Sequence, residues 1–167
     1  RAHSANERFK TRYQTPMTDA IKAIVKSKKL DHIDIRWNGI EGKKNGKRLT
    51  ASELVGIYCQ AKDVQEAIEM GLPDRGQQGF KDNLLMDGNE VSHKDVIRIV
   101  EDALAGTNLK DNLWKAVNQA TLFSLIYQRR HRFISRNTFD EYKSRKFYVP
   151  ERGWRERDLE DRERKYV

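Results

Sequence analysis

The residues of this sequence best suited to a chemical role are basic side chains that stand close to aromatic rings. A first group lies in a glycine-rich stretch after Trp37 and consists of Lys43, Lys44, Lys47 and Arg48. A second group follows Tyr127 and consists of Arg129, Arg130, Arg132 and Arg136. Cationic side chains neutralise phosphates, and nearby rings can stack on unpaired bases. These residues are the predicted contacts to DNA or RNA, although lysine-rich loops are often only solvated and arginines commonly cap helices.

The formal charge of +8 is distributed unevenly along the 167 residues. Residues 1–48 carry 13 basic and 5 acidic side chains, residues 49–127 carry 7 and 12, and residues 128–167 carry 13 and 8. Two basic ends therefore flank an acidic middle. This asymmetry favours either a polyanionic partner or electrostatic docking of the ends onto the middle, and the sequence leaves both open.

The titratable residues form no recognisable catalytic or metal-binding motif. The four histidines stand in no His-x-x-x-His or Cys/His arrangement; they are His3, His32, His93 and His131. A metal site needs three or four converging ligands, so no metal and no cofactor are expected. Asp31 and Asp34 with His32 could form an acid–base group, but a charged strand edge is the commoner outcome of such a run.

The single cysteine, Cys59, lies in an apolar run and is expected to be a small buried residue. One thiol cannot form an intrachain disulfide, which suits a reducing compartment. The glycines of residues 38–48 lack the ordered G-x-x-x-x-G-K-[ST] spacing of a phosphate-binding loop. We therefore expect no catalytic residue. An enzyme with an unfamiliar site near residues 31–37 and the 74–91 loop is kept as an alternative hypothesis.

Helical periodicity dominates the elements that must position these side chains. Ser4 with Glu7, and Thr50 with Glu53, have the spacing of capping boxes. Pro16 predicts a kink, or two helices that meet at Thr15. The predicted helices span about residues 4–29, 50–70, 92–106, 107–132 and 138–146.

The segments between the helices predict little β structure. Residues 31–37 alternate polar and apolar side chains, which allows one short strand. Residues 38–48 are expected to form a mobile basic loop or the tip of a hairpin. Residues 74–91 are expected to form a long loop with one turn. The fold class predicted is all-α or nearly so, with five or six helices and a small β-hairpin element near residues 31–49.

The chain has neither a run of about 18 apolar residues nor an initial signal segment, so no membrane partner is expected. Together with the single cysteine, this predicts a cytoplasmic protein. The first residue is Arg1 rather than Met, which we interpret as a fragment of a longer chain. The predicted organisation is a helical domain over residues 1–154 and a charged C-terminal helix or tail over residues 155–167.

An ordered series of motifs covers about a third of the chain. It consists of WKAVNQATLFSL at residues 114–125, FIS at 133–135, Tyr142, and FYVPERGW at 147–154, with NERF at 6–9 and TPMTDAI at 15–21 upstream. The series resembles the helical region of large polyvalent proteins carried by phages and conjugative elements. Glu151 departs from the apolar residue expected after the proline. The resemblance implies that this region is a spacer or scaffold, and it assigns no catalytic residue to this sequence.

These observations favour a non-catalytic helical module of a larger mobile-element protein. Its partners would be the neighbouring domains of the parent chain, with DNA or RNA contacted through the basic ends. A stand-alone basic nucleic-acid-binding domain is the alternative from a different class. A contiguous positive face would favour nucleic-acid binding, and a polar pocket with converging carboxylates and a histidine would favour an enzyme.

Overall fold

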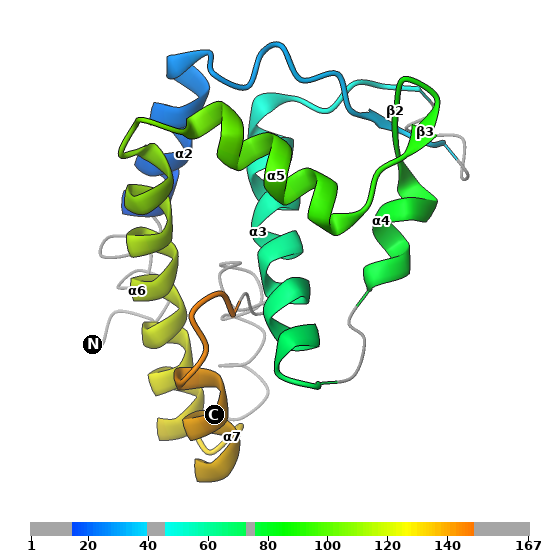
Figure 1. The fold of residues 1–167 in the computed structure, drawn as a ribbon. Coiled ribbons are helices and arrows are strands. Elements are labelled where there is room, and N and C mark those ends of the chain that lie inside the picture. Colours follow the sequence, from blue (N-terminus) through cyan, green and yellow to red (C-terminus); the bar gives the residue numbers. More distant parts are fainter. Residues whose placement is uncertain (1–14, 40–45, 73–75, 149–167) are drawn as a thin grey trace. The chain divides into compact units, whose positions relative to one another are not determined.

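The computed structural model describes residues 15–39, 46–72 and 76–148 (Figure 1). Within these ranges the chain forms six helices and one three-stranded antiparallel sheet. This confirms the predicted fold class, mostly helical with a small β element. No helix among the described residues is long and apolar enough to cross a membrane.

The described residues divide into two compact units. Residues 21–110 form one, which we call the central unit. Residues 15–20 with 111–148 form the other, which we call the α6–α7 unit after its helices α6 (Leu109–Arg130) and α7 (Arg136–Lys143). Helix α2 (Thr15–Ser27) begins in the α6–α7 unit and continues into the central unit. Thr15 is the first described residue, so the kink or helix junction predicted there stays a prediction. The predicted helical segment before it lies outside the described residues, as does its capping box.

The sheet of the central unit joins two segments that are far apart in the sequence. Strands β1 (Arg36–Trp37), β2 (Leu84–Met86) and β3 (Asn89–Glu90) lie in the order β1-β2-β3. Arg36 pairs with Leu85 in the antiparallel register of β1 and β2. The strands are too short to be stable in isolation, so the helices of the unit must support them.

The other edge of β1 pairs with the residues that follow the basic loop. The Trp37 N–H donates to the Lys47 carbonyl oxygen at 2.9 Å, and the Leu49 N–H donates to the Ile35 carbonyl oxygen at 2.8 Å. These two arms are the β-hairpin element predicted near residues 31–49. The tip of the hairpin, residues 40–45, lies outside the described residues.

Our prediction of a long loop over residues 74–91 was wrong. Helix α4 (Gln77–Asn83) leads directly into β2, and β2 and β3 form a two-residue hairpin. Asp87 and Gly88, at φ 52° and 77°, form its turn. Positive φ at both central residues is typical of a type I′ turn, for which Asp-Gly is a favoured sequence. That dipeptide was the missed signal.

Helices α3 (Ala51–Glu69) and α5 (His93–Leu104) pack against each other in the central unit. Each begins with a capping box, in which a side-chain oxygen satisfies amide groups that the first turn leaves free. Tyr58 is fully buried, and its hydroxyl donates to Glu101 Oε2 at 2.7 Å. Lys62 Nζ lies 3.4 Å from the same carboxylate. A shared carboxylate therefore links the two helices.

Two isoleucines on apolar helix stripes are exposed. Helical periodicity places Ile68 of α3 and Ile126 of α6 (Leu109–Arg130) among the inward-facing residues, yet they are 40% and 37% exposed. In α3 the buried stripe also includes Val55 and Cys59. The apolar residues of that helix form a stripe wider than the contact surface, so its edge reaches solvent.

The α6–α7 unit consists of α6, α7 (Arg136–Lys143) and a segment that returns toward α6 (Figure 1). Helix α7 was predicted from residue 138, but it begins at Arg136 because Ser135 Oγ accepts the Thr138 N–H at 3.1 Å. The ring of Phe147 packs edge-on against Trp114 with 4.8 Å between ring centroids. Met17 of α2 and Phe133 pack against the buried Ala120 and Tyr127, so the core of the unit lies along α6.

Candidate nucleic-acid interface

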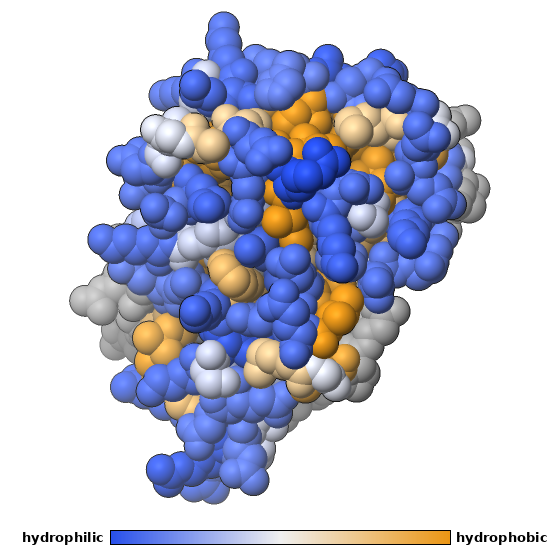
Figure 2. Space-filling view, viewed as in Figure 1, coloured by the Kyte–Doolittle hydropathy of each residue, from blue (hydrophilic) through white to orange (hydrophobic). Residues whose placement is uncertain are grey.

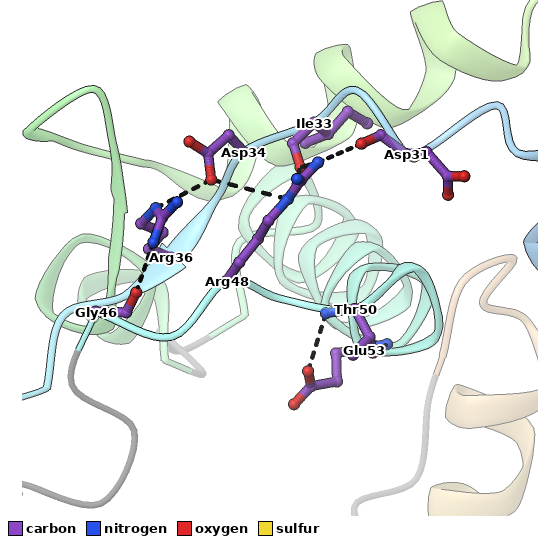
Figure 3. A network of polar contacts seen from close by, with 8 residues as sticks. All are labelled: Asp31, Ile33, Asp34, Arg36, Gly46, Arg48, Thr50 and Glu53. Atoms are coloured by element: carbon purple, nitrogen blue, oxygen red, sulfur yellow. Dashed lines mark hydrogen bonds and ion pairs between the residues drawn. The ribbon is translucent and has the colours of Figure 1, made fainter.

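The hairpin arginines form a network within the central unit (Figure 3). Arg48 donates from Nε and from one terminal nitrogen to the Ile33 carbonyl oxygen at 3.2 and 3.1 Å. It also donates to the carbonyl oxygen of Asp31. Asp34 Oδ1 lies 3.8 Å from Arg48 Nε and 3.0 Å from Arg36 Nε. Arg48 thereby holds the segment before β1 in place.

The four residues of the first group of predicted nucleic-acid contacts differ in their structural environment. Lys43 and Lys44 lie outside the described residues. Lys47 is exposed, and no hydrogen bond or ion pair to its side chain is found among the described residues. Arg48 donates hydrogen bonds to backbone carbonyl groups, although its side chain is 45% exposed. Its position is explained by local structure without a phosphate.

The two segments named for an unfamiliar enzyme site do come together. Strands β1 and β2 pair, and Asn38 Nδ2 donates to the Asp82 carbonyl oxygen at 3.0 Å. The Asp34 carboxylate there contacts two guanidinium groups, and His32 is exposed. Among the described residues, no group of three or more His, Cys, Asp or Glu side chains could hold a metal ion.

Cys59 and His93 are both buried in the central unit. Burial raises the pKa of the Cys59 thiol to about 12, so the thiolate needed for nucleophilic attack is scarce at neutral pH. This agrees with its predicted role as a small buried residue. His93, 2% exposed at the start of α5, lies 6.1 Å from the Phe80 ring. Both residues are therefore part of the core.

The second group of predicted contacts surrounds the junction of α6 and α7. We call it the basic corner, and it consists of Arg129, Arg130, His131, Arg132 and Arg136. All five residues are exposed. The surface over this end of α6 and α7 is hydrophilic in Figure 2. The structure therefore brings the four predicted arginines together at one junction and adds a histidine.

The end of α6 gives the basic corner its shape. The Phe133 N–H donates to the Gln128 carbonyl oxygen at 2.8 Å, and the Arg132 N–H donates to that of Arg129 at 3.1 Å. These are the two hydrogen bonds of a Schellman motif. Arg132 occupies its left-handed position, at φ 57°. Glycine is the usual residue there, because a Cβ atom strains this conformation.

The basic corner lies in a stretch of the sequence without acidic residues. No Asp or Glu occurs between Asp111 and Asp140. None of the four arginine side chains forms a hydrogen bond or ion pair with another described residue. This distinguishes them from Arg48. The absence of acidic residues was visible in the sequence, and it is the signal that could have ranked this group above the first.

Aromatic rings lie directly behind the basic corner. The His131 ring centroid is 4.4 Å from that of Tyr127 and 5.7 Å from that of Phe133, and the latter pair is stacked at 25°. Tyr127 is buried and Phe133 is half-buried, whereas His131 is exposed. The histidine ring is therefore the outermost of three clustered rings.

A second ring cluster fixes α7 against the returning segment. Tyr142 stacks on Tyr148 with 4.4 Å between centroids and 8° between planes. The buried guanidinium of Arg145 lies 5.4 Å from the Tyr148 ring centroid. Thr121 Oγ1 donates to the Tyr148 carbonyl oxygen at 3.3 Å, which ties the segment to α6. These contacts fix the C-terminal end of α7 and the returning segment against α6.

Comparison of the chain with protein-family models, with curated proteins and with solved structures found no match. The functional assignment therefore depends on the geometry of the site.

Proposed function

We propose that this chain is a non-catalytic helical module that contacts nucleic acid through the basic corner. One observation carries the proposal. Four exposed arginines, Arg129, Arg130, Arg132 and Arg136, gather at one helix junction without an acidic side chain bound to them among the described residues.

The chemistry of arginine supports a phosphate partner. Its planar guanidinium can donate two parallel hydrogen bonds to one phosphate group. Neighbouring cations repel each other unless a counter-ion or a partner screens them. Two of the arginines, Arg129 and Arg130, lie in the last turn of α6, where cations interact favourably with the helix dipole. That interaction accounts for those two positions, but not for Arg132 and Arg136.

The wider role we propose is that of a scaffold within a larger mobile-element protein, next to other domains of the same chain. The resemblance to polyvalent proteins supports it, since the WKAVNQATLFSL and FIS motifs lie on α6 and on the α6–α7 junction. The charge of the Asp34 carboxylate is offset by two guanidinium groups, which favours a structural rather than a catalytic role.

Fluorescence anisotropy with labelled single-stranded DNA, duplex DNA and RNA tests the proposal. At low salt we expect binding that weakens steeply as salt rises toward physiological levels. The variant Arg129→Gln/Arg130→Gln should weaken binding to every probe sequence evenly, because phosphate contacts carry no sequence information.

The matched control is Lys94→Gln/Arg98→Gln, which removes two exposed positive charges from α5. It changes the net charge of the chain by the same amount but leaves the basic corner intact, so it should bind nearly as well as the wild type. Equal losses of affinity in both variants would show that binding depends only on the net charge of the chain. Absence of binding at low salt would overturn the proposal and favour electrostatic docking onto protein.

A further inference from the structure

The exposed ring of His131 gives the basic corner a feature that phosphate contact does not require. The ring is carried by the residue that follows α6, where the His131 N–H still donates to the Tyr127 carbonyl oxygen at 3.1 Å. Its chain neighbours on both sides are exposed arginines, Arg130 and Arg132. A flat polarisable surface therefore lies inside a cluster of positive charge.

The rings behind His131 restrict its orientation. The distance between the Tyr127 and Phe133 centroids is 6.1 Å, compared with 4.4 and 5.7 Å from each to His131. Three rings at such separations form a triangle, and they do not form a column with the imidazole in the middle. The Tyr127 and Phe133 rings therefore do not enclose the imidazole between them, and His131 is exposed. Phe133 is itself held by its backbone hydrogen bond to Gln128.

We infer that the basic corner binds single-stranded nucleic acid, with an unpaired base stacked on the His131 ring and the flanking phosphates on the arginines. This inference depends on the proposed function and narrows it to one substrate class. Proteins that bind single strands combine a positive surface with rings on which bases stack. In an intact duplex each base face is covered by its neighbours, so a stacking ring adds nothing to duplex binding.

The test compares oligothymidine with a hairpin duplex of the same number of phosphates, at one low salt concentration. The wild type is expected to bind the single strand more tightly. His131→Ala should weaken oligothymidine binding roughly tenfold, because loss of one stacked base by alanine substitution typically has that effect. The same variant should leave duplex binding unchanged. His131→Phe keeps a flat ring without the imidazole nitrogens, and it should retain most of the single-strand affinity.

A tryptophan at the same position reports the stacking directly. In His131→Trp, the indole fluorescence should be quenched by saturating oligothymidine and much less by the hairpin. Circular dichroism melting curves establish that each variant is folded. His131→Ala removes the ring contacts to Tyr127 and Phe133 and should lower the melting temperature slightly, whereas His131→Phe and His131→Trp keep a ring and should change it less.

The outcomes separate this inference from the proposed function. Duplex binding as tight as single-strand binding, with no loss in His131→Ala, would overturn the inference and leave phosphate contact by the arginines intact. If His131→Phe lost as much affinity as His131→Ala, stacking would also be excluded. If neither nucleic acid bound the wild type, the proposed function itself would fail.

Discussion

Arg48 donates two hydrogen bonds to the carbonyl oxygen of Ile33, at 3.2 and 3.1 Å. The contact spans fifteen residues of chain and fixes the segment before β1 against the returning arm of the hairpin. The exposed arginines of the basic corner have no such contact with a described residue. This difference separates basic residues that build the fold from those that remain available to a partner.

Replacement of Arg48 is therefore expected to affect stability more than binding. Arg48→Ala removes the donors to backbone carbonyl groups, and hydrogen bonds from a charged group typically contribute about 1.5–3 kcal/mol. We expect a smaller loss of stability, about 1–2 kcal/mol, since water can reach a side chain that is 45% exposed. Urea unfolding followed by circular dichroism measures the change. Lys47→Ala is the adjacent control and should change stability by less than about 0.5 kcal/mol. Equal stability of the two variants would contradict the structural role.

Arg132 provides a test in which stability and binding change in opposite directions. Arg132→Gly relieves the left-handed backbone strain at φ 57° and should raise the free energy of unfolding by about 1 kcal/mol. The same change removes one cation from the basic corner and should weaken nucleic-acid binding severalfold. Melting curves and anisotropy on the same preparation measure both effects. A variant that was more stable and bound equally well would show that Arg132 is not a contact.

Cys59 is expected to resist thiol reagents in the folded protein. Burial raises its pKa to about 12, and the side chain is 7% exposed, so neither thiolate nor access is available near neutral pH. Ellman's reagent should label the native protein only as fast as the central unit opens, and should label it at once in denaturant. Rapid stoichiometric labelling without denaturant would contradict the buried position.

The capping box of α5 predicts a pH-dependent contribution to stability. The Ser92 backbone N–H donates to the Asp95 carboxylate at 3.1 Å and lowers the pKa of that group, against a smaller opposing effect of burial. A lowered folded-state pKa stabilises the protein above the unfolded pKa of about 3.9, and this stabilisation is lost as pH falls through the folded value. The side chain is 43% exposed, so the contribution should stay below about 1 kcal/mol. The stability difference between wild type and Asp95→Asn at pH 6 should shrink progressively as the pH falls below the unfolded pKa. A difference that stayed constant with pH would show that ionisation of Asp95 is not its cause.

The helices could be predicted because their signals are local. Thr50 with Glu53 marks the start of α3 through contacts within one turn of chain. The sheet was harder to predict, since β2 has three residues and its partner β1 lies about fifty residues earlier. Such short strands carry almost no periodicity, and only Asp87-Gly88 marked the hairpin.

The candidate site was predicted as a set of residues but not as a geometry. Both basic groups lay close to aromatic residues in the sequence, and apart from the acid-free stretch around the second group nothing indicated that Arg48 bonds to backbone carbonyl groups while Arg129 does not. The distinction depends on the chain reversal that brings Arg48 to the carbonyl groups of Asp31 and Ile33. The left-handed conformation of Arg132 is equally a property of the folded helix end.

The salt dependence of binding tests the central claim most directly. For a single strand, the slope of log K against log salt concentration is about −0.7 for each phosphate neutralised. We expect Arg129→Gln/Arg130→Gln to reduce the magnitude of the oligothymidine slope by about 1.4, as two lost contacts require, while Lys94→Gln/Arg98→Gln leaves it unchanged. An identical slope in the wild type and both variants would show that the basic corner does not contact phosphate, and would contradict this account.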